Sequence, residues 1–356
     1  MKSNLKKSLS ALALATTLLT SLHPQTAAAE EKDHFTLAWS IYVGWMPWDY
    51  ADQAGIIDKW AKKYGISIDV VQVNDYVESI NQYSAGQFDA TVMTNMDALT
   101  IPAASGVDST ALIVGDFSNG NDGIVLKGKK SLADIKGQNV NLVELSVSHY
   151  LMARGLESVG MSEKDVKVVN TSDADLVSAF TTDDVTAAVT WNPLLSEITS
   201  HPDTSLVFDS SKIPGEIIDL LVVNSDTLKD NPKLAKALTG AWYEVMGLMN
   251  SDKADEVKTA MAKASGTDLV GYNAQLGATH MFFNPQDAVE FTKSSKLKDT
   301  MQKVAEFSFD QGILGEGASD ASFIGIETPS GVYGNPSNVQ LRFTPEYMEM
   351  AAKGEL

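Results

Sequence analysis

Aromatic side chains gather in one short stretch near the start of the chain. Tyr42, Trp45 and Trp48 lie close together there, and Trp191 stands in a later Thr-Trp-Asn-Pro segment. The face of an aromatic ring attracts a planar or cationic ligand by about 0.5–2 kcal/mol. These four rings could therefore form the walls of a binding site, and ordinary packing in the hydrophobic core is the alternative for each.

Acidic and amide side chains follow several apolar segments that we interpret as strands. These residues are Asn95, Asp97, Asp116, Glu144, Glu216 and Asp219. Ligands of open parallel sheets bind beyond the carboxyl ends of the strands, so all six are candidate ligand-binding residues. Asp97 could instead cap a helix, and Asp116 could introduce a turn.

The scarcity of arginine bears on the charge of the ligand. Arg154 and Arg342 are the arginines of the chain, and neither follows a predicted strand. Anion receptors commonly use an arginine fork, whereas acids and rings suit a planar cation with many donors, such as guanidinium. An acidic protein also has acids at such positions by chance. The rival ligand is an anion such as nitrate or sulfonate, or taurine, held by amides around Ser146 and His149 at a helix start.

Alternating strand and helix patterns position these residues. We expect a first series of strands and helices up to residue 115, a polar stretch, and a second series from residue 139. Expected elements include strand 110–115, a return strand at 217–223, and helices at 48–64, 271–282 and 287–311. Strict alternation with short links predicts doubly wound, mainly parallel sheets. The predicted fold is α/β, with two lobes, a two-strand hinge and a ligand cleft between the lobes.

The first 29 residues have the three zones of a signal peptide. Lysines come first, an apolar run extends from Leu9 to Leu22, and three alanines end at Ala29. We expect cleavage near Ala29 and export without membrane insertion, because the apolar run is shorter than the roughly 20 residues that span a bilayer. The predicted parts are the signal peptide at 1–29, lobe 1 at 30–117, lobe 2 at 118–221 and a return to lobe 1 at 222–356.

Composition narrows the functional classes. The chain has no cysteine and a formal net charge of −19. The absence of cysteine excludes disulfides, thiolate metal sites, cysteine nucleophiles and a lipid-bearing cysteine, and the charge argues against nucleic acid or an anionic membrane as partner. The sequence has no nucleophile elbow, phosphate loop or histidine cluster. We therefore expect a protein that is not an enzyme and that uses no metal or cofactor.

Three segments resemble a known family in their order and spacing. They are GQFDATVMTNMDAL from Gly86, LVELSVSHYLMARGLESVGM from Leu142 and AAVTWNPLLSEI from Ala187. Together they resemble the nitrate/sulfonate/taurine class of ABC transporter substrate-binding proteins. The segments at 324–329 and 338–348 most resemble the branch associated with urea carboxylase and guanidine, whose members have been described as urea transporters.

The resemblance implies a type II periplasmic binding-protein fold. It also implies that the chain is a monomeric periplasmic component of an ABC importer, with permease and ATPase subunits as partners and a small nitrogen-rich solute, guanidine or urea, as ligand. A pyrimidine-synthase relative of this fold would need a cysteine-rich signature, which this chain cannot have. Delivery of the ligand to a receptor instead of a permease is the remaining alternative.

Overall fold

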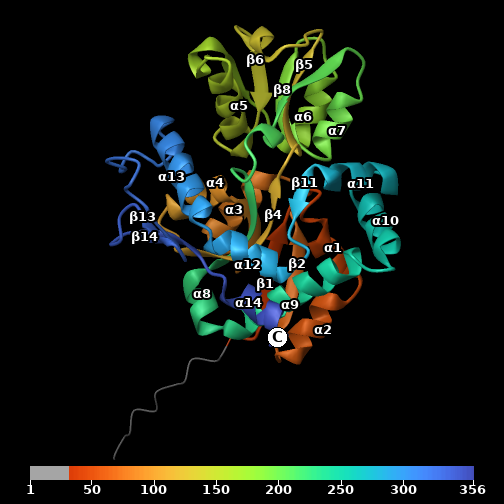
Figure 1. Cartoon of the computed structure of the whole chain (residues 1–356), viewed down its shortest axis with the longest axis vertical. Helices are drawn as coiled ribbons and strands as arrows, with labels where there is room; N and C mark the ends of the chain where they lie inside the picture. The colour runs from red at the N-terminus through yellow and green to blue at the C-terminus, as the bar shows by residue number, and fades with distance from the viewer. Residues whose placement is uncertain (1–31) are drawn as a thin grey trace, which may run out of the picture. The chain divides into compact units, whose positions relative to one another are not determined.

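Two β-sheets organise the chain in the computed structural model, which describes residues 32–356 (Figure 1). The predicted signal peptide at residues 1–29 lies outside the described residues. Asp33 to Leu356 form one compact unit. In this part of the chain, no helix combines the length and apolar character that crossing a membrane requires.

The larger sheet belongs to lobe 1. Its strand order is β13-β12-β14-β4-β10-β3-β1-β2, and β11 pairs with β4. The strands β10, β11 and β13 run antiparallel to their neighbours, and the other pairings are parallel. The strands are β1 (His34–Trp39), β2 (Ser67–Gln72), β3 (Ala90–Thr94), β4 (Ser109–Ser118), β10 (Ile218–Asn224), β11 (Thr279–Met281), β12 (Gly325–Thr328), β13 (Gly331–Tyr333) and β14 (Val339–Phe343).

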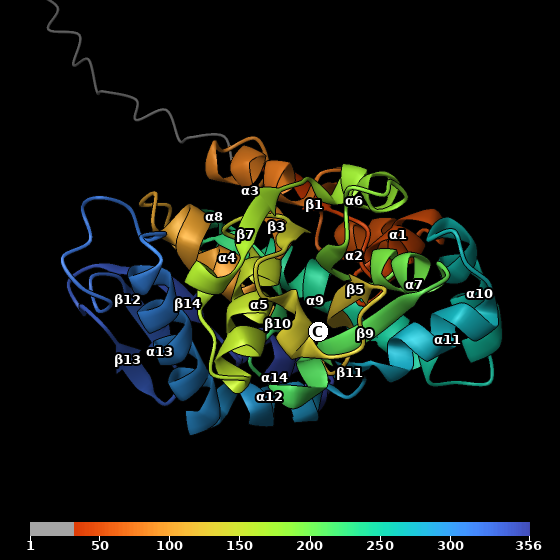
Figure 2. The same cartoon turned by 90° about the horizontal axis from the view of Figure 1, so that it is seen from above.

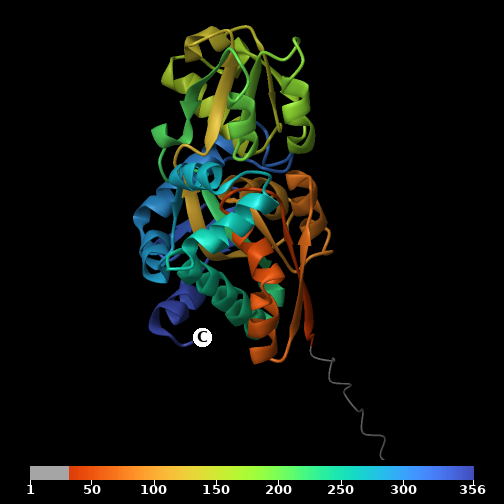
Figure 3. The same cartoon turned by 90° about the vertical axis from the view of Figure 1, so that its right-hand side faces the viewer.

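The helices of lobe 1 pack on this sheet and on one another. Helices α1 and α2 contact α9, and Figure 3 shows this layer beside the strands. The elements are α1 (Met46–Gln53), α2 (Ile56–Lys63), α3 (Tyr76–Ser84), α4 (Asn95–Ala98), η1 (Leu99–Ala103), α8 (Ser225–Asp230), α9 (Pro232–Met249), α10 (Ala254–Ala264), α11 (Leu269–Gly277), α12 (Pro285–Lys293), α13 (Ser295–Asp310) and α14 (Glu346–Lys353).

The smaller sheet belongs to lobe 2, and its order is β7-β6-β8-β5-β9. Only β5 among these strands runs antiparallel to both of its neighbours. Helix α5 contacts this sheet, and α6 and α7 contact it from the other side (Figure 2). The elements are β5 (Asp122–Lys127), η2 (Leu132–Ile135), β6 (Asn139–Leu142), α5 (Val147–Ser158), η3 (Glu163–Asp165), β7 (Lys167–Asn170), α6 (Asp173–Phe180), β8 (Ala187–Trp191), α7 (Leu194–Thr199), β9 (Thr204–Asp209) and η4 (Ser210–Lys212).

Two chain segments connect the lobes, as the predicted hinge requires. Residues 119–121 leave β4 for β5, and residues 210–217 return from β9 to β10. The hydroxyls of Ser118 and Ser210 lie 2.6 Å apart and join the two segments. Strand β10 pairs with β3 and β4 along its length, so the sequence-based boundary at residue 221 falls inside this strand.

Three predicted helices differ from the observed elements. The helix expected at 48–64 is two helices, because Gly55 has a φ of 68° and separates α1 from α2. The helix expected at 287–311 is also two, because the Ser294 side chain caps α13 at Lys296 N. The end of the helix expected at 271–282 is β11, which pairs with β4. Strand β4 reaches Ser118 instead of residue 115, so Asp116 lies inside the strand.

Candidate functional site

A small buried cavity lies where the carboxyl ends of the lobe 1 strands meet lobe 2. Its volume is about 10 Å³, close to the space that one water molecule needs, so a larger ligand requires the lining side chains or the two lobes to move apart. Both lobes and the return segment contribute to it. Its lining residues are Tyr42, Trp45, Tyr76, Thr94, Asp122, Val147, Trp191, Ile217 and Asp219.

Four aromatic rings form a continuous wall around this cavity. The centroid of Trp45 lies 4.9 Å from that of Tyr42 and 5.5 Å from that of Tyr76. Tyr76 in turn contacts Trp191 of lobe 2 edge to face at 5.5 Å. The indole nitrogen of Trp45 is buried without a hydrogen-bond partner. The structure therefore brings the rings of Tyr42, Trp45 and Trp191 together, and it adds Tyr76.

Asp116 and Asp219 form a carboxyl pair at the base of the cavity. Antiparallel pairing of β4 and β10 places them directly opposite each other. The Tyr42 hydroxyl donates to Asp116 Oδ1 at 3.0 Å. Burial raises the pKa of Asp116 to about 7 against the opposing effect of hydrogen bonds with Asp219 and Tyr42. Burial and the nearby charges of Asp116 and Asp122 raise the pKa of Asp219 well above its usual range.

Two further buried acids flank this pair. Asp122 begins β5 opposite Trp191 of β8, and burial raises its pKa to about 7. Asp97 lies in the first turn of α4, where its Oδ2 accepts hydrogen bonds from Tyr76 OH at 2.6 Å and Thr94 Oγ1 at 2.8 Å. Burial raises the pKa of Asp97 to about 6, although these hydroxyls act to lower it. Thr94 provides the cap of α4, and the Asp97 carboxyl group is held by Tyr76 and Thr94 next to the cavity without lining it.

The oxygens of these acids are the main unsatisfied polar atoms around the cavity. Asp97 Oδ1, Asp116 Oδ2 and Asp219 Oδ2 are buried and have no hydrogen-bond partner. Among residues 32–356, no lysine, arginine or histidine forms an ion pair with any of the four acids. Buried polar groups in proteins are almost always paired, so these acceptors call for a ligand that brings donors. The described residues contain no cluster of three or more acids and histidines that could hold a metal ion.

Of the twelve predicted site residues, Tyr42, Trp45, Trp191 and Asp219 line the cavity; the eight others do not, and these are Trp48, Asn95, Asp97, Asp116, Glu144, Ser146, His149 and Glu216. Trp48 packs against Trp242 of α9 with a centroid separation of 5.1 Å, in the core of lobe 1. The side chain of Asn95 accepts a hydrogen bond from Ile218 N at 3.0 Å and donates one to Glu216 O at 3.1 Å. Asn95 therefore fixes the segment that returns from lobe 2 to lobe 1. Glu144 is exposed.

The start of α5 uses its polar groups internally. The Ser146 hydroxyl caps the helix by accepting a hydrogen bond from Ser148 N at 3.2 Å, and it donates a hydrogen bond to Val143 O. His149 Nδ1 accepts a hydrogen bond from Leu145 N at 3.1 Å, and His149 Nε2 lies 3.1 Å from Glu163 Oε1. The amides that an anion would need at this helix start are therefore largely occupied by the chain itself.

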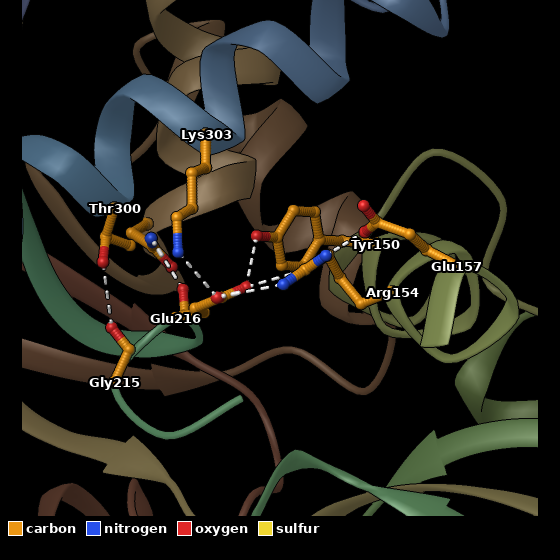
Figure 4. A network of polar contacts seen from close by, with 8 residues as sticks. Tyr150, Arg154, Glu157, Gly215, Glu216, Thr300 and Lys303 are labelled. Carbon is orange, nitrogen blue, oxygen red and sulfur yellow. Dashed lines mark hydrogen bonds and ion pairs between the residues drawn. The ribbon is translucent and has the colours of Figure 1, made fainter. Parts of the chain in front are cut away.

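Glu216 belongs to a separate network between the lobes (Figure 4). Tyr150 OH and Arg154 Nε of α5 donate to its Oε2 at 2.7 and 2.9 Å, and Lys303 of α13 reaches its Oε1 at 3.1 Å. Although partial burial acts to raise it, hydrogen bonds from Arg154, Tyr150 and Lys303 hold the pKa of Glu216 below its usual range. Arg154 thus braces the protein, and Glu216 joins α5 of lobe 2 to α13 of lobe 1.

The sequence reasoning missed Tyr76 and Asp122. Asp122 begins a strand instead of following one, but β5 is antiparallel to β8, so its amino end lies at the same sheet edge as the carboxyl end of β8. Tyr76 follows β2 after a short loop and begins α3. A search that included helix starts and antiparallel strand starts could have found both.

The lobes, the hinge and the interlobe cavity define the fold of the two-lobed type II periplasmic binding proteins. The chain belongs to the NMT1/THI5-like family, whose model matches residues 56–250.

Solved structures share the fold. The alkanesulfonate-binding protein SsuA of Xanthomonas axonopodis pv. citri, bound to MOPS, is 17% identical with a TM-score of 0.67, covering 81% of this chain and 96% of that one. The nitrate-binding protein NrtA of Synechocystis PCC 6803 is 14% identical with a TM-score of 0.58, covering 90% and 98%.

Sequence relatives match a shorter region. The taurine-binding periplasmic protein of Escherichia coli is 20% identical over 182 residues, which are 50% of this chain and 56% of that protein. A relative from Brucella abortus, whose name gives it only as a binding protein, is 26% identical over 180 residues, again 50% and 56%. The chain therefore spans about half the length of the curated relatives that it matches.

Proposed function

We propose that the protein is the periplasmic solute-binding component of an ABC importer and that its ligand is a small planar cation, guanidinium. The fold, the family and the names of the relatives support the transport role. The observation that carries the choice of ligand is the set of buried carboxyl oxygens without donors, beside an aromatic wall and without a basic partner.

Guanidinium matches the residues of this lining in charge and in hydrogen bonding. It is flat, it carries N–H donors on every edge, and it has no acceptor, as in the arginine side chain. Its edges can donate to Asp219 and Asp122, which line the cavity, while its faces meet the rings of Trp45 and Trp191. Its positive charge offsets the cost of burying ionised carboxylates, which is large when they have no partner.

An anion is the rival ligand, because the similar proteins described above include ones named for sulfonate, nitrate and taurine binding. Nitrate would bring further acceptors to a cavity lined by Asp219, whose Oδ2 already lacks a donor. The start of α5, where an anion could find amides, is capped by Ser146 and His149. Urea is neutral and would leave the buried charge uncompensated.

A thermal-shift and calorimetry panel tests the proposal. Ligand-free mature protein is titrated with guanidinium chloride, urea, sodium nitrate and taurine, with sodium chloride at equal ionic strength as the salt control. We expect guanidinium alone to raise the melting temperature and to release heat in a saturable way. Asp219→Asn should weaken this binding, and Glu144→Gln, which changes an exposed acid, should match the wild type. Stabilisation by nitrate or taurine without guanidinium would overturn the proposal.

A further inference from the structure

We propose that ligand capture exchanges a proton for a cation. In the ligand-free protein the Asp116–Asp219 pair holds a proton between its carboxyl groups, and the arriving cation displaces it to solvent, so the pair selects ligands by charge. This inference rests on the proposed function, and it goes further by assigning the selectivity to these two residues.

The backbone holds the two carboxyl groups together. Asp116 of β4 and Asp219 of β10 are register partners on the central antiparallel strands of lobe 1. Tyr42 OH fixes Asp116 Oδ1, and the remaining Oδ2 atoms of both acids are buried without a donor. Two buried carboxylates in contact cannot both stay ionised, so one proton is shared between them.

Asp116 also has no room to move away from its partner. A Cβ atom added at Gly44 would lie 2.5 Å from Asp116 Oδ2 and 2.5 Å from Tyr42 Cε1. The chain at Gly44 therefore closes the space behind the carboxyl group. Asp219 lines the cavity in front of it, so a ligand reaches the pair through Asp219.

The titratable groups around the pair do not supply a positive charge. Tyr42 faces it from the segment before α1, Asp122 from β5 and Tyr272 from α11, and Asp97 of α4 lies near Asp122. Strand β11 places uncharged Met281 opposite Asp116.

The neighbouring side chains of β3 and β11 are either uncharged or directed away from the pair. Strand β3 places Thr94 opposite Asp219. The His280 ring stacks on Phe117 at 4.4 Å. Burial raises the pKa of Asp116, and burial together with the charge of Asp116 raises the pKa of Asp219 well above its usual range, so the pair keeps its shared proton at neutral pH until a cation arrives.

The exchange is balanced in charge. A cation enters the cavity, the shared proton leaves to water or buffer, and the pair becomes two carboxylates facing one positive ligand. A neutral or anionic ligand of the same shape brings no charge to replace the proton, so the proton stays on the pair. The number of protons released on binding then reports the charge of the ligand at this site.

Calorimetry in two buffers tests the exchange. Guanidinium chloride is titrated into the mature wild-type protein at pH 7 in phosphate and in Tris, whose ionisation enthalpies differ widely, at equal ionic strength. We expect the observed enthalpy to differ between the buffers by an amount corresponding to release of close to one proton per ligand bound. The binding constant should also rise with pH across the neutral range.

Variants locate the proton. Asp219→Asn should bind guanidinium more weakly and reduce the proton release toward zero, while Glu144→Gln should release protons like the wild type. The wild-type measurement decides the matter even if Asp219→Asn fails to fold. Guanidinium binding with a buffer-independent enthalpy would overturn the exchange and leave the proposed ligand intact. Absence of guanidinium binding would instead overturn the proposed function.

Discussion

Replacement of Asp97 by asparagine should make the ligand-free protein more stable at neutral pH. The carboxyl group is fully buried, and its Oδ2 accepts hydrogen bonds from Tyr76 and Thr94, which an asparagine oxygen can also accept. What the substitution removes is an ionisable group in a site that does not favour its charged form.

The size of the effect follows from the pKa of Asp97. Burial raises this pKa from 3.8 to about 6, so between these values the folded state binds more protons than the unfolded state. The favourable contribution is complete below pH 3.8 and is lost as the pH rises through about 6. A rise of about two units corresponds to roughly 3 kcal/mol, or about 4 °C in melting temperature for a chain of this length.

Thermal melting followed by circular dichroism between pH 4 and pH 8 measures this effect. Guanidinium and urea are unsuitable as denaturants because both are candidate ligands. Relative to Asp97→Asn, the wild type should lose stability as the pH rises through about 6, and the two curves should converge in acid. Glu144→Gln provides the control and should follow the wild type. Parallel curves for the wild type and Asp97→Asn at every pH would refute the reasoning.

Further predictions concern the aromatic wall and the interlobe network. Trp191→Ala should weaken guanidinium binding about tenfold, as calorimetry would show. Trp48→Phe should lower the melting temperature and leave the affinity for guanidinium unchanged. Equal losses of affinity in the two variants would contradict the placement of Trp48 in the core. Glu216→Gln should lower the free energy of unfolding by about 1–2 kcal/mol, because it weakens charged hydrogen bonds to Arg154 and Lys303 that solvent partly screens. Since the pKa of Glu216 is held below its ordinary value, this difference should be present above pH 4.5 and fade as the pH falls below it. A difference that grows in acid would contradict this role.

The sequence predicted the lobes and hinge well because alternating apolar segments specify strands and helices locally. It predicted the break at Gly55 poorly, since apolar spacing continues across that residue from α1 to α2. The structure also shows why the residues around the candidate site were harder to find. Asp122 depends on the antiparallel register of β5 with β8, a long-range property that a single segment does not reveal.

Side-chain direction explains the other differences. Trp45 and Trp48 share the same aromatic stretch, but Trp45 faces the cavity and Trp48 faces Trp242 on α9. Glu216 and Asp219 are three residues apart, yet Glu216 pairs with Arg154 outside the cavity and Asp219 lines it. Composition and spacing could not separate the members of either pair.

A crystal structure of the mature protein with guanidinium tests the central claim most directly. The account predicts a planar ligand in the cavity between Trp45 and Trp191, with nitrogen atoms within hydrogen-bond distance of the carboxyl groups of Asp219 and Asp122. Guanidinium found only on the surface, or an anion bound at the start of α5 beside Ser146, would contradict it.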